Sequence, residues 1–365
     1  DNNGNDNATE ERVLFFDSFV QCGVLGQANS VYTLTENVIS AGTCFNIIAN
    51  NITLNCNGYE INYSYSGVLG YGVNVSGANF TMIRDCRIVE GSSVGSDKSG
   101  VQFNNAHNGT IINNTISIIG ASSEGIFLSS SFNISILNNN ITTASGSGAK
   151  GIEIVSSSDF NFISDNFITT SNSNGEGIRV DGGSNSKFIN NNISTSGGSA
   201  EGIHMKVGSS NTFINNSIAT SGGKSAGILF DNGPSNNNSF INMIVKTTHA
   251  TSNATVIGTG RHNFTITDSI VNALGAAGFD LFVESATGGE WNFTNVTGSS
   301  GESIDFGWRV GAKCTLNVIW YVDAYANYSN STDAPDANIS AFNNINGLQF
   351  SKLTGQDGRI PRQTV

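Results

Sequence analysis

Apolar residues recur along this chain in short alternating runs, and a glycine introduces each run. After each glycine, apolar residues alternate with other types, as in Ile178-Arg-Val and Ile203-His-Met. Successive side chains of a strand point to opposite faces, so one apolar set is predicted to face inward. A Gly-Ile dipeptide returns about every 25 residues, at Gly125, Gly151, Gly177, Gly202 and Gly227, and Gly100-Val101 is a weaker first copy.

A second apolar run precedes each Gly-Ile dipeptide and predicts a second strand in every repeat. Turn-forming Ser, Gly and Asn residues separate the runs, and no run shows helical periodicity. A unit this short cannot bury its own apolar face, so it must stack on its neighbours. The pattern therefore predicts an all-β parallel β-helix over residues 45–310, with rungs about 4.8 Å apart. Its inward columns are Ile126, Ile152, Ile178, Ile203 and Ile228, and then Ile116, Ile141, Ile168, Ile193 and Ile218.

One asparagine recurs in register with the predicted strands, about one repeat apart. The members are Asn114, Asn139, Asn166, Asn191 and Asn216. In a β-helix, inward asparagines at a turn can form hydrogen bonds up and down the stack as a ladder. We favour this structural role over an Asn-lined ligand site.

The ends of the chain depart from the repeat. Residues 1–16 are predicted to be an N-terminal tail with a possible donated strand, and residues 17–60 a cap with the first rungs. Residues 61–310 form the parallel β-helix. Residues 311–365 resemble the start of an immunoglobulin-like β-sandwich module, with three or four predicted strands where a sandwich needs about seven. The chain starts at Asp1, without Met or a visible signal peptide, which predicts a mature or trimmed product.

The apolar segment Val13, Leu14, Phe15 and Phe16 has no partner in the repeat pattern. An unfinished C-terminal sheet would expose unpaired backbone groups and accept an added strand. Donation of residues 11–19 to the next copy predicts a head-to-tail homo-oligomer or filament. The alternative is that this segment caps its own first rung.

Five cysteines suggest an oxidising compartment. Cys56 and Cys86 fall in equivalent strands of successive rungs, and Cys22 and Cys44 flank the N-terminal segment. Our preferred pairing is Cys22–Cys44 and Cys56–Cys86. Cys314 remains, as a buried thiol or an intermolecular link.

Composition and charge narrow the class of protein. Charged residues make up 12% of the 365 residues, and the formal net charge of −12 is spread thinly, without a basic cluster. This argues against nucleic acid and anionic membranes as partners, and no apolar run is long enough to span a membrane. The four histidines and the cysteines lack the spacing of metal ligands, and no phosphate-binding or dinucleotide-binding motif is present, so no metal or cofactor is expected.

Asn-X-Ser/Thr sequons are dense, which would suit a secreted, cell-surface glycoprotein. An Asn-rich and Ser/Thr-rich chain produces many of them by chance. The predicted glycosylation sites are Asn79, Asn108, Asn253, Asn327, Asn330 and Asn338.

The segment from Cys44 to Ile61, with the pattern Cys-x-x-Ile-x-Ala-x-Asn-Ile-Thr-Leu-x-Cys-x-Gly-x-x-Ile, resembles a known family. The repeats Asn-x-x-Ile-x-Asn-Asn-x-Ile followed by Gly-Ile are similar to the same family. It comprises secreted right-handed parallel β-helix proteins of the NosD-type, pectin-lyase-like kind. The resemblance covers about residues 20–310. It implies the fold strongly and the function poorly, since the family includes polysaccharide lyases, hydrolases, epimerases and surface proteins.

Ionisable residues gather on the outward positions that follow the Gly-Ile dipeptides. A cross-rung charge ladder explains them, because Glu153–Arg179 and Asp181–Lys206–Asp231 alternate in sign. A catalytic role is the alternative, although the separation of Asp181 and Asp231, two rungs or about 10 Å, is marginal for a glycosidase. If the chain is an enzyme, the candidate catalytic residues are Asp181, Lys206, Asp231, Glu153, Arg179 and His204.

These observations favour a non-enzymatic, extracellular structural glycoprotein, either a cell-surface protein or a filament subunit. The favoured partner is a second copy of the chain, with glycans as a further possibility. The alternative function is a carbohydrate-active enzyme of the lyase or hydrolase type, or a glycan-binding protein, on the same scaffold. Under the favoured interpretation, no turnover of pectin or alginate is expected.

Overall fold

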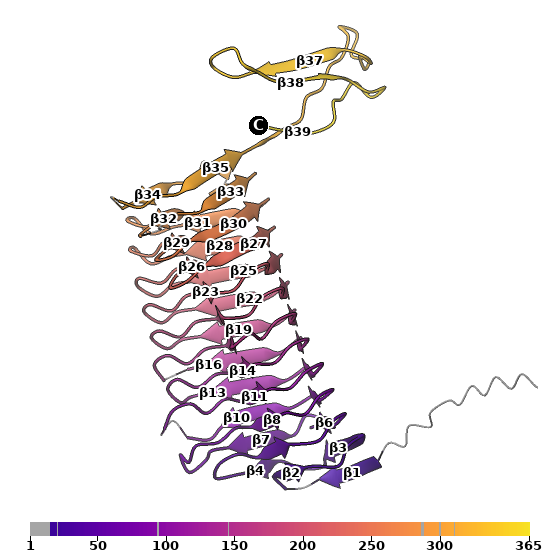
Figure 1. The fold of residues 1–365 in the computed structure, drawn as a ribbon, viewed down its shortest axis with the longest axis vertical. Helices are drawn as coiled ribbons and strands as arrows, with labels where there is room; N and C mark the ends of the chain where they lie inside the picture. The colour runs from indigo at the N-terminus through magenta and orange to yellow at the C-terminus, as the bar shows by residue number, and fades with distance from the viewer. Residues whose placement is uncertain are drawn as a thin grey trace, which may run out of the picture.

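The computed structural model describes residues 15–19, 21–92, 95–144, 146–285, 288–298, 301–309 and 311–365. Three parallel sheets run along the molecule, and each turn of the chain adds one strand to each sheet in succession. Figure 1 shows the strands stacked in register from β1 to β35. The fold is the predicted all-β parallel solenoid.

We call the three sheets A, B and C. Sheet A has 13 strands in the described chain: β1 (Phe15–Phe19), β3 (Ser30–Leu34), β6 (Thr53–Asn55), β9 (Met82–Arg84), β12 (Thr110–Ile112), β15 (Ser135–Leu137), β18 (Phe162–Ser164), β21 (Lys187–Ile189), β24 (Thr212–Ile214), β27 (Ser235–Ile241), β30 (His262–Thr267), β33 (Glu290–Thr294) and β35 (Thr315–Ile319).

Sheet B has 12 strands in the described chain: β2 (Gly23–Leu25), β5 (Phe45–Ile47), β8 (Val73–Ser76), β11 (Val101–Asn104), β14 (Ile126–Ser129), β17 (Ile152–Val155), β20 (Ile178–Asp181), β23 (Ile203–Val207), β26 (Ile228–Phe230), β29 (Thr255–Ile257), β32 (Leu281–Val283) and β34 (Phe306–Trp308). Sheet C has 10: β4 (Val38–Ile39), β7 (Glu60–Tyr63), β10 (Arg87–Glu90), β13 (Thr115–Ile118), β16 (Asn140–Thr143), β19 (Phe167–Thr170), β22 (Asn192–Thr195), β25 (Ser217–Thr220), β28 (Ile244–Thr247) and β31 (Ile270–Ala273).

The inward isoleucine column of sheet B forms as predicted. Pairing joins Ile126 to Ile152, then Ile178, Ile203 and Ile228, and all five side chains are fully buried. The glycine before each isoleucine is required by close packing. A Cβ at Gly151 would collide with the carbonyl oxygen of Gly177 in the next rung and with the Ile168 side chain. The Gly-Ile dipeptide thus marks the point where adjacent rungs approach most closely.

The predicted asparagine ladder is present and continuous. Each side-chain amide donates to the Oδ1 of the next asparagine, at 3.0 Å for Asn114 to Asn139 and for Asn139 to Asn166, and at 2.9 Å for Asn166 to Asn191 and for Asn191 to Asn216. The same oxygens accept backbone N–H groups of the preceding rung. Buried polar groups need such partners, because an unpaired one costs about 1–3 kcal/mol.

Both preferred disulfides are present. Cys22–Cys44 and Cys56–Cys86 join neighbouring rungs, with Cα atoms 4.5 and 4.7 Å apart. Cys314 is a free, half-buried thiol, and its burial raises its pKa to about 11.

The two ends differ from the sequence-based expectation. Residues Phe15–Phe19 form β1 and pair in parallel with β3 of the same chain, so this segment has a partner within its own solenoid. Val13 and Leu14 lie outside the described residues. At the other end, β35 pairs in parallel with β33, so the solenoid continues beyond residue 310 to Ile319. The rungs after Gly227-Ile228 lack the Gly-Ile signature, so the repeat pattern does not mark where the solenoid ends.

Beyond β35 the chain forms two small antiparallel pairs, β36 (Tyr321–Val322) with β39 (Gln363–Thr364), and β37 (Asn338–Phe342) with β38 (Leu348–Leu353). Figure 1 shows the β37–β38 hairpin standing beyond the end of the solenoid. No helix long and apolar enough to cross a membrane occurs in the described residues.

Replacing Ile178 with Asp tests the inward column. We expect the free energy of unfolding to fall by roughly 4 kcal/mol or more, since an unpaired charge would enter the core. Urea denaturation followed by circular dichroism measures it. The same substitution at Ile244, which is 42% exposed on β28, is the matched control and should change stability little. Equal effects at the two positions would contradict the assigned column.

Replacing Asn166 with Ala tests the ladder. Its carboxamide serves Asn139, Asn191 and two backbone carbonyls, so the variant leaves several buried groups unpaired. The expected loss is about 2–5 kcal/mol, from about 1–3 kcal/mol for each group that finds no substitute. Asn192→Ala, at an exposed position of β22, serves as the comparison. If Asn166→Ala lowers the free energy of unfolding no more than Asn192→Ala does, the ladder does not stabilise the fold.

Candidate functional site

The outer face of sheet B carries a line of ionisable side chains. Glu153 on β17, Arg179 on β20 and His204 on β23 follow one another in register. Arg179 Nε lies 3.3 Å from Glu153 Oε1, and Lys206 Nζ lies 3.1 Å from Asp181 Oδ2. The opposite charges expected from the sequence therefore do pair across rungs.

A second row, formed by the residues just before the glycines, packs against the first. It consists of Glu124, Lys150, Glu176 and Glu201, all buried. Lys150 Nζ lies 3.2 Å from Glu124 Oε1 and 3.4 Å from Glu153 Oε2. Burial raises the pKa of Glu124 to about 7, despite the opposing charge of Lys150. We call these two rows, with Asp181 and Lys206, the ion-pair network.

Arg179 is the central cation of the network. Its guanidinium approaches three carboxylates: Glu153, Asp181 at 3.0 Å and Glu176 at 3.8 Å. Burial alone would lower the pKa of Arg179, but these carboxylates outweigh it and raise the pKa. Asp181 behaves in the opposite sense, because its hydrogen bonds to Arg179 and Lys206 outweigh burial and lower its pKa.

The network ends in a buried cluster of two carboxylates and one imidazole. His204 Nδ1 lies 2.7 Å from Glu176 Oε1. One potential ligand atom from each of Glu176, Glu201 and His204 lies within 4.8 Å of the others. Burial, followed by the charge of Glu176, raises the pKa of Glu201 to about 8. Among the described ion pairs, none includes Glu201.

Asp231 leaves the ladder that the sequence predicted for it. A bulge shifts the register after Val180, so Asp181 pairs with Val207 rather than Lys206. Asp231 Oδ1 instead accepts hydrogen bonds from the Thr259 hydroxyl at 2.6 Å and the Thr259 N–H at 3.1 Å. Burial would raise the pKa of Asp231, but the bonds from Thr259 and from the Asn232 N–H outweigh it and lower the pKa. Asp231 is thereby held as an ionised carboxylate.

A hollow of about 450 Å³ adjoins the network on the same face of sheet B. Half-buried Leu229, Val256 and Phe282, at equivalent positions of β26, β29 and β32, line its apolar part. The remaining lining residues are mostly polar: Glu201, Lys224, Ser225, Ala226, Thr251, Asn253, Glu284 and Arg309. It therefore combines an apolar strip with a charged and polar rim, as ligand sites commonly do.

Glu284, which no sequence motif marks, lies in register with Asp231. Phe230, Ile257 and Val283 form one column, so the residues that follow them, Asp231, Gly258 and Glu284, form the next. Asp231 leans over Gly258, since a Cβ on that glycine would meet Asp231 Oδ1 at 2.8 Å. The two carboxylates are thus two rungs apart with only a glycine between them. The Gly-Ile signature ends at Gly227-Ile228 on the rung of Asp231, so no motif marks Glu284 two rungs further on.

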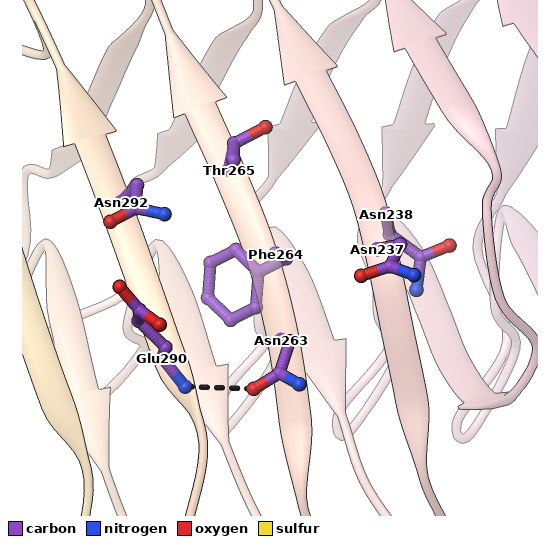
Figure 2. A pocket seen from close by; sticks show the side chains of 7 residues that line it. All are labelled: Asn237, Asn238, Asn263, Phe264, Thr265, Glu290 and Asn292. Atoms are coloured by element: carbon purple, nitrogen blue, oxygen red, sulfur yellow. Dashed lines mark hydrogen bonds between the residues drawn. The ribbon is translucent and has the colours of Figure 1, made fainter.

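A second hollow of about 360 Å³ lies on sheet A, over β27, β30 and β33. Figure 2 shows its amide side chains, including Asn263 and Asn292, with a hydrogen bond of 2.8 Å from the Glu290 N–H to Asn263 Oδ1. Glu290 is the one carboxylate in its lining. It lacks the carboxylate pair that acid–base chemistry on a glycosidic bond requires.

The predicted sequons fall into two groups. Asn327, Asn330 and Asn338 are exposed. Asn79, Asn108 and Asn253 are half-buried, and their Oδ1 atoms already accept hydrogen bonds. Glycosylation, like head-to-tail assembly through Phe15 and Phe16, remains a prediction.

Solved structures share the fold of this chain at low sequence identity. A DFA-IIIase from Arthrobacter chlorophenolicus A6 in complex with GF2 matches with a TM-score of 0.54 and 11% identity, over 82% of this chain and 88% of that one. The same enzyme without its lid matches with a TM-score of 0.53 and 10% identity, over the same shares of both chains. Endopolygalacturonase I from Stereum purpureum, complexed with two galacturonate, reaches 0.47 and 15%, over 84% of this chain and 92% of its own.

These comparisons correct the expectation of a non-enzymatic protein. That expectation rested on the absence of a compact catalytic cluster in the sequence. The fold matches are to enzymes, and the structure gathers ionisable side chains beside a hollow. Identities of 10–15% show the shared fold and leave the reaction of this chain open.

No curated protein sequence matches the chain. The family model described as "Periplasmic copper-binding protein (NosD)" matches residues 67–269, more than half of the chain. The periplasmic description and the two disulfides both indicate a location outside the cytoplasm. The stacked rungs, their asparagine ladder and this match together establish that the chain belongs to the NosD family.

Proposed function

We propose that this chain is a carbohydrate-active enzyme that hydrolyses a polysaccharide outside the cytoplasm. The substrate lies along the outer face of sheet B, in the hollow lined by Leu229, Val256 and Phe282. The carbon–hydrogen faces of a sugar ring suit this apolar strip, and its hydroxyl groups suit the polar rim. Two findings support the proposal. The chain belongs to a family with β-helix architecture, and enzymes are among the solved structures that share its fold.

The observation that carries the proposal is the carboxylate pair Asp231 and Glu284. Equivalent positions two rungs apart are separated by about 10 Å between Cα atoms, a marginal spacing by itself. The Asp231 carboxylate leans over Gly258, the intervening residue, which brings it closer to the rung of Glu284. Inverting glycosidases place their carboxyl groups roughly 6.5–9.5 Å apart, with room for a water molecule. Gly258 has no side chain, and this leaves room for the Asp231 carboxylate above it. The pair therefore suits inversion rather than the closer approach that retention requires.

The surroundings of the two carboxylates assign their roles. Asp231 is held ionised by Thr259 and Asn232, which suits a base that takes a proton from the attacking water. Glu284 Oε1 lies 2.9 Å from Arg309 Nη1, and the side chains are 42% and 62% exposed, respectively. Such a pair is worth only about 0–1 kcal/mol, so a bound sugar can displace Arg309. Without Arg309 and covered by the sugar, the Glu284 carboxylate can take up a proton from solvent, and it then donates this proton to the leaving oxygen.

The family description also names copper, and one group of described residues fits it in part. Glu176, Glu201 and His204 offer carboxylate oxygens and an imidazole nitrogen, which suit Cu²⁺. Cu⁺ prefers thiolate and thioether ligands, and this group contains neither. These three residues would hold the ion, which would supply a fixed positive charge at one end of the hollow. The hydrolytic proposal uses no step at this ion.

The variants Asp231→Asn and Glu284→Gln test the proposed reaction. Each is expected to lower kcat about 10²–10⁴-fold on the polysaccharide that the wild-type chain cleaves, the usual contribution of an acid or base. A panel of neutral and acidic polysaccharides identifies that substrate by release of reducing ends. Proton NMR of the first product gives the anomeric outcome, which should be inversion.

Glu60→Gln is the matched control, since Glu60 pairs with Arg87 on another sheet, 3.0 Å away. It should retain wild-type activity. Retention of the anomeric configuration would contradict the assigned spacing. Binding of an oligosaccharide without any cleavage across the panel would replace hydrolysis with a glycan-binding function.

A further inference from the structure

We propose that Glu176, Glu201 and His204 form a binding site for one divalent transition-metal cation. The site lies on the outer face of sheet B, where the ion-pair network meets the hollow. It is separate from the Asp231–Glu284 pair, and the inference stands whether or not the chain hydrolyses a polysaccharide.

The three side chains are already gathered for a shared ligand. One potential ligand atom from each lies within 4.8 Å of the others. The residues are 7%, 9% and 8% exposed, respectively, so the gathering is built into the fold and is not a chance meeting at the surface. Glu176 comes from the turn before β20, Glu201 from the turn before β23, and His204 from β23 itself. Their register fixes the separation of the three donors.

Two buried polar atoms of the cluster make no hydrogen bond, and one of them, Glu176 Oε2, has only the Arg179 guanidinium at 3.8 Å as a partner. His204 Nε2 and Glu176 Oε2 are shielded from solvent, and neither makes a hydrogen bond in the described chain. Buried polar atoms without partners are rare and call for an explanation. His204 is more than nine-tenths buried, and its other nitrogen is already committed to Glu176. A cation bound between the donors would give these buried atoms a partner.

The local charge balance also favours a cation. Arg179, the nearest guanidinium, is 3.8 Å from Glu176 and is shared with Glu153 and Asp181 at shorter distances. Within the described residues, Glu201 has no ion-pair partner. Three carboxylates therefore share the Arg179 guanidinium, and Glu201 is not among them. Buried charges are normally paired or coordinate a metal.

The donor types select the class of metal. Mg²⁺ and Ca²⁺ take oxygen ligands almost exclusively, whereas Zn²⁺ and Cu²⁺ accept imidazole together with carboxylate. Three protein donors are also the usual number in a zinc site that keeps a further position for a small ligand. We therefore assign the site to Zn²⁺ or Cu²⁺ rather than to Ca²⁺.

Equilibrium dialysis of the purified, metal-stripped chain against Zn²⁺, and separately against Cu²⁺, tests the site. The wild-type chain is expected to bind about one equivalent. Glu201→Gln and His204→Gln should each weaken binding by at least ~100-fold, since even outer-shell changes cost about 10–100-fold. Asp181→Asn removes a carboxylate of the same network that is not a ligand, and it should bind within about twofold of wild type.

Electron paramagnetic resonance of the Cu²⁺ form gives a readout independent of affinity and of catalysis. The wild-type spectrum should show coupling to an imidazole nitrogen, and His204→Gln should lose it. Circular dichroism of each variant checks that the solenoid is intact. Binding that is absent in the wild type, or equal in all variants, would overturn the site. If Asp181→Asn weakens metal binding as much as Glu201→Gln does, the cation is attracted by the overall negative charge and is not held by these three ligands.

Discussion

The register of the rungs is the constraint on which the rest of the structure depends. Parallel pairing places every residue directly over its equivalent in the next rung, as the column from Ile126 to Ile228 shows. Each side chain therefore lies about 4.8 Å from the side chain at the equivalent position of the next rung. Apolar residues gain a continuous core from this arrangement. Polar residues must find partners along the stack, which the asparagine ladder achieves inside and the ion pairs achieve outside.

The same register produces the candidate site. Charges on the outer face of sheet B pair across rungs as far as His204, and then the alternation of sign ends. From that point on the outward column becomes apolar, at Leu229, Val256 and Phe282, and a hollow opens. At the transition, Asp231 leaves the cross-rung ion pairs, and Glu284 pairs only with the exposed Arg309. The proposed chemistry is therefore placed where the repeat is interrupted.

Strict repetition decided what could be predicted from the sequence. The strand columns, the ladder and the pairs Glu153–Arg179 and Asp181–Lys206 follow from residues that recur at fixed intervals, and the Cys56–Cys86 disulfide follows from equivalent strands of successive rungs. Asp231 is absent from the ladder because its carboxylate accepts hydrogen bonds from Thr259 and Asn232, which spacing along the sequence does not reveal. Glu284 and the last rung, β35, lie where the Gly-Ile signature has ended. The closeness of Glu176, Glu201 and His204 depends on side-chain direction, which spacing alone does not give.

A structure of the chain with a bound oligosaccharide, solved for the inactive Asp231→Asn variant, tests the central claim most directly. The account predicts sugar rings over Leu229, Val256 and Phe282, with a glycosidic oxygen beside Glu284. Sugar bound instead on sheet A, at the hollow lined by Asn263 and Asn292, or on sheet C would contradict the claim that the interrupted outer face of sheet B is the functional surface.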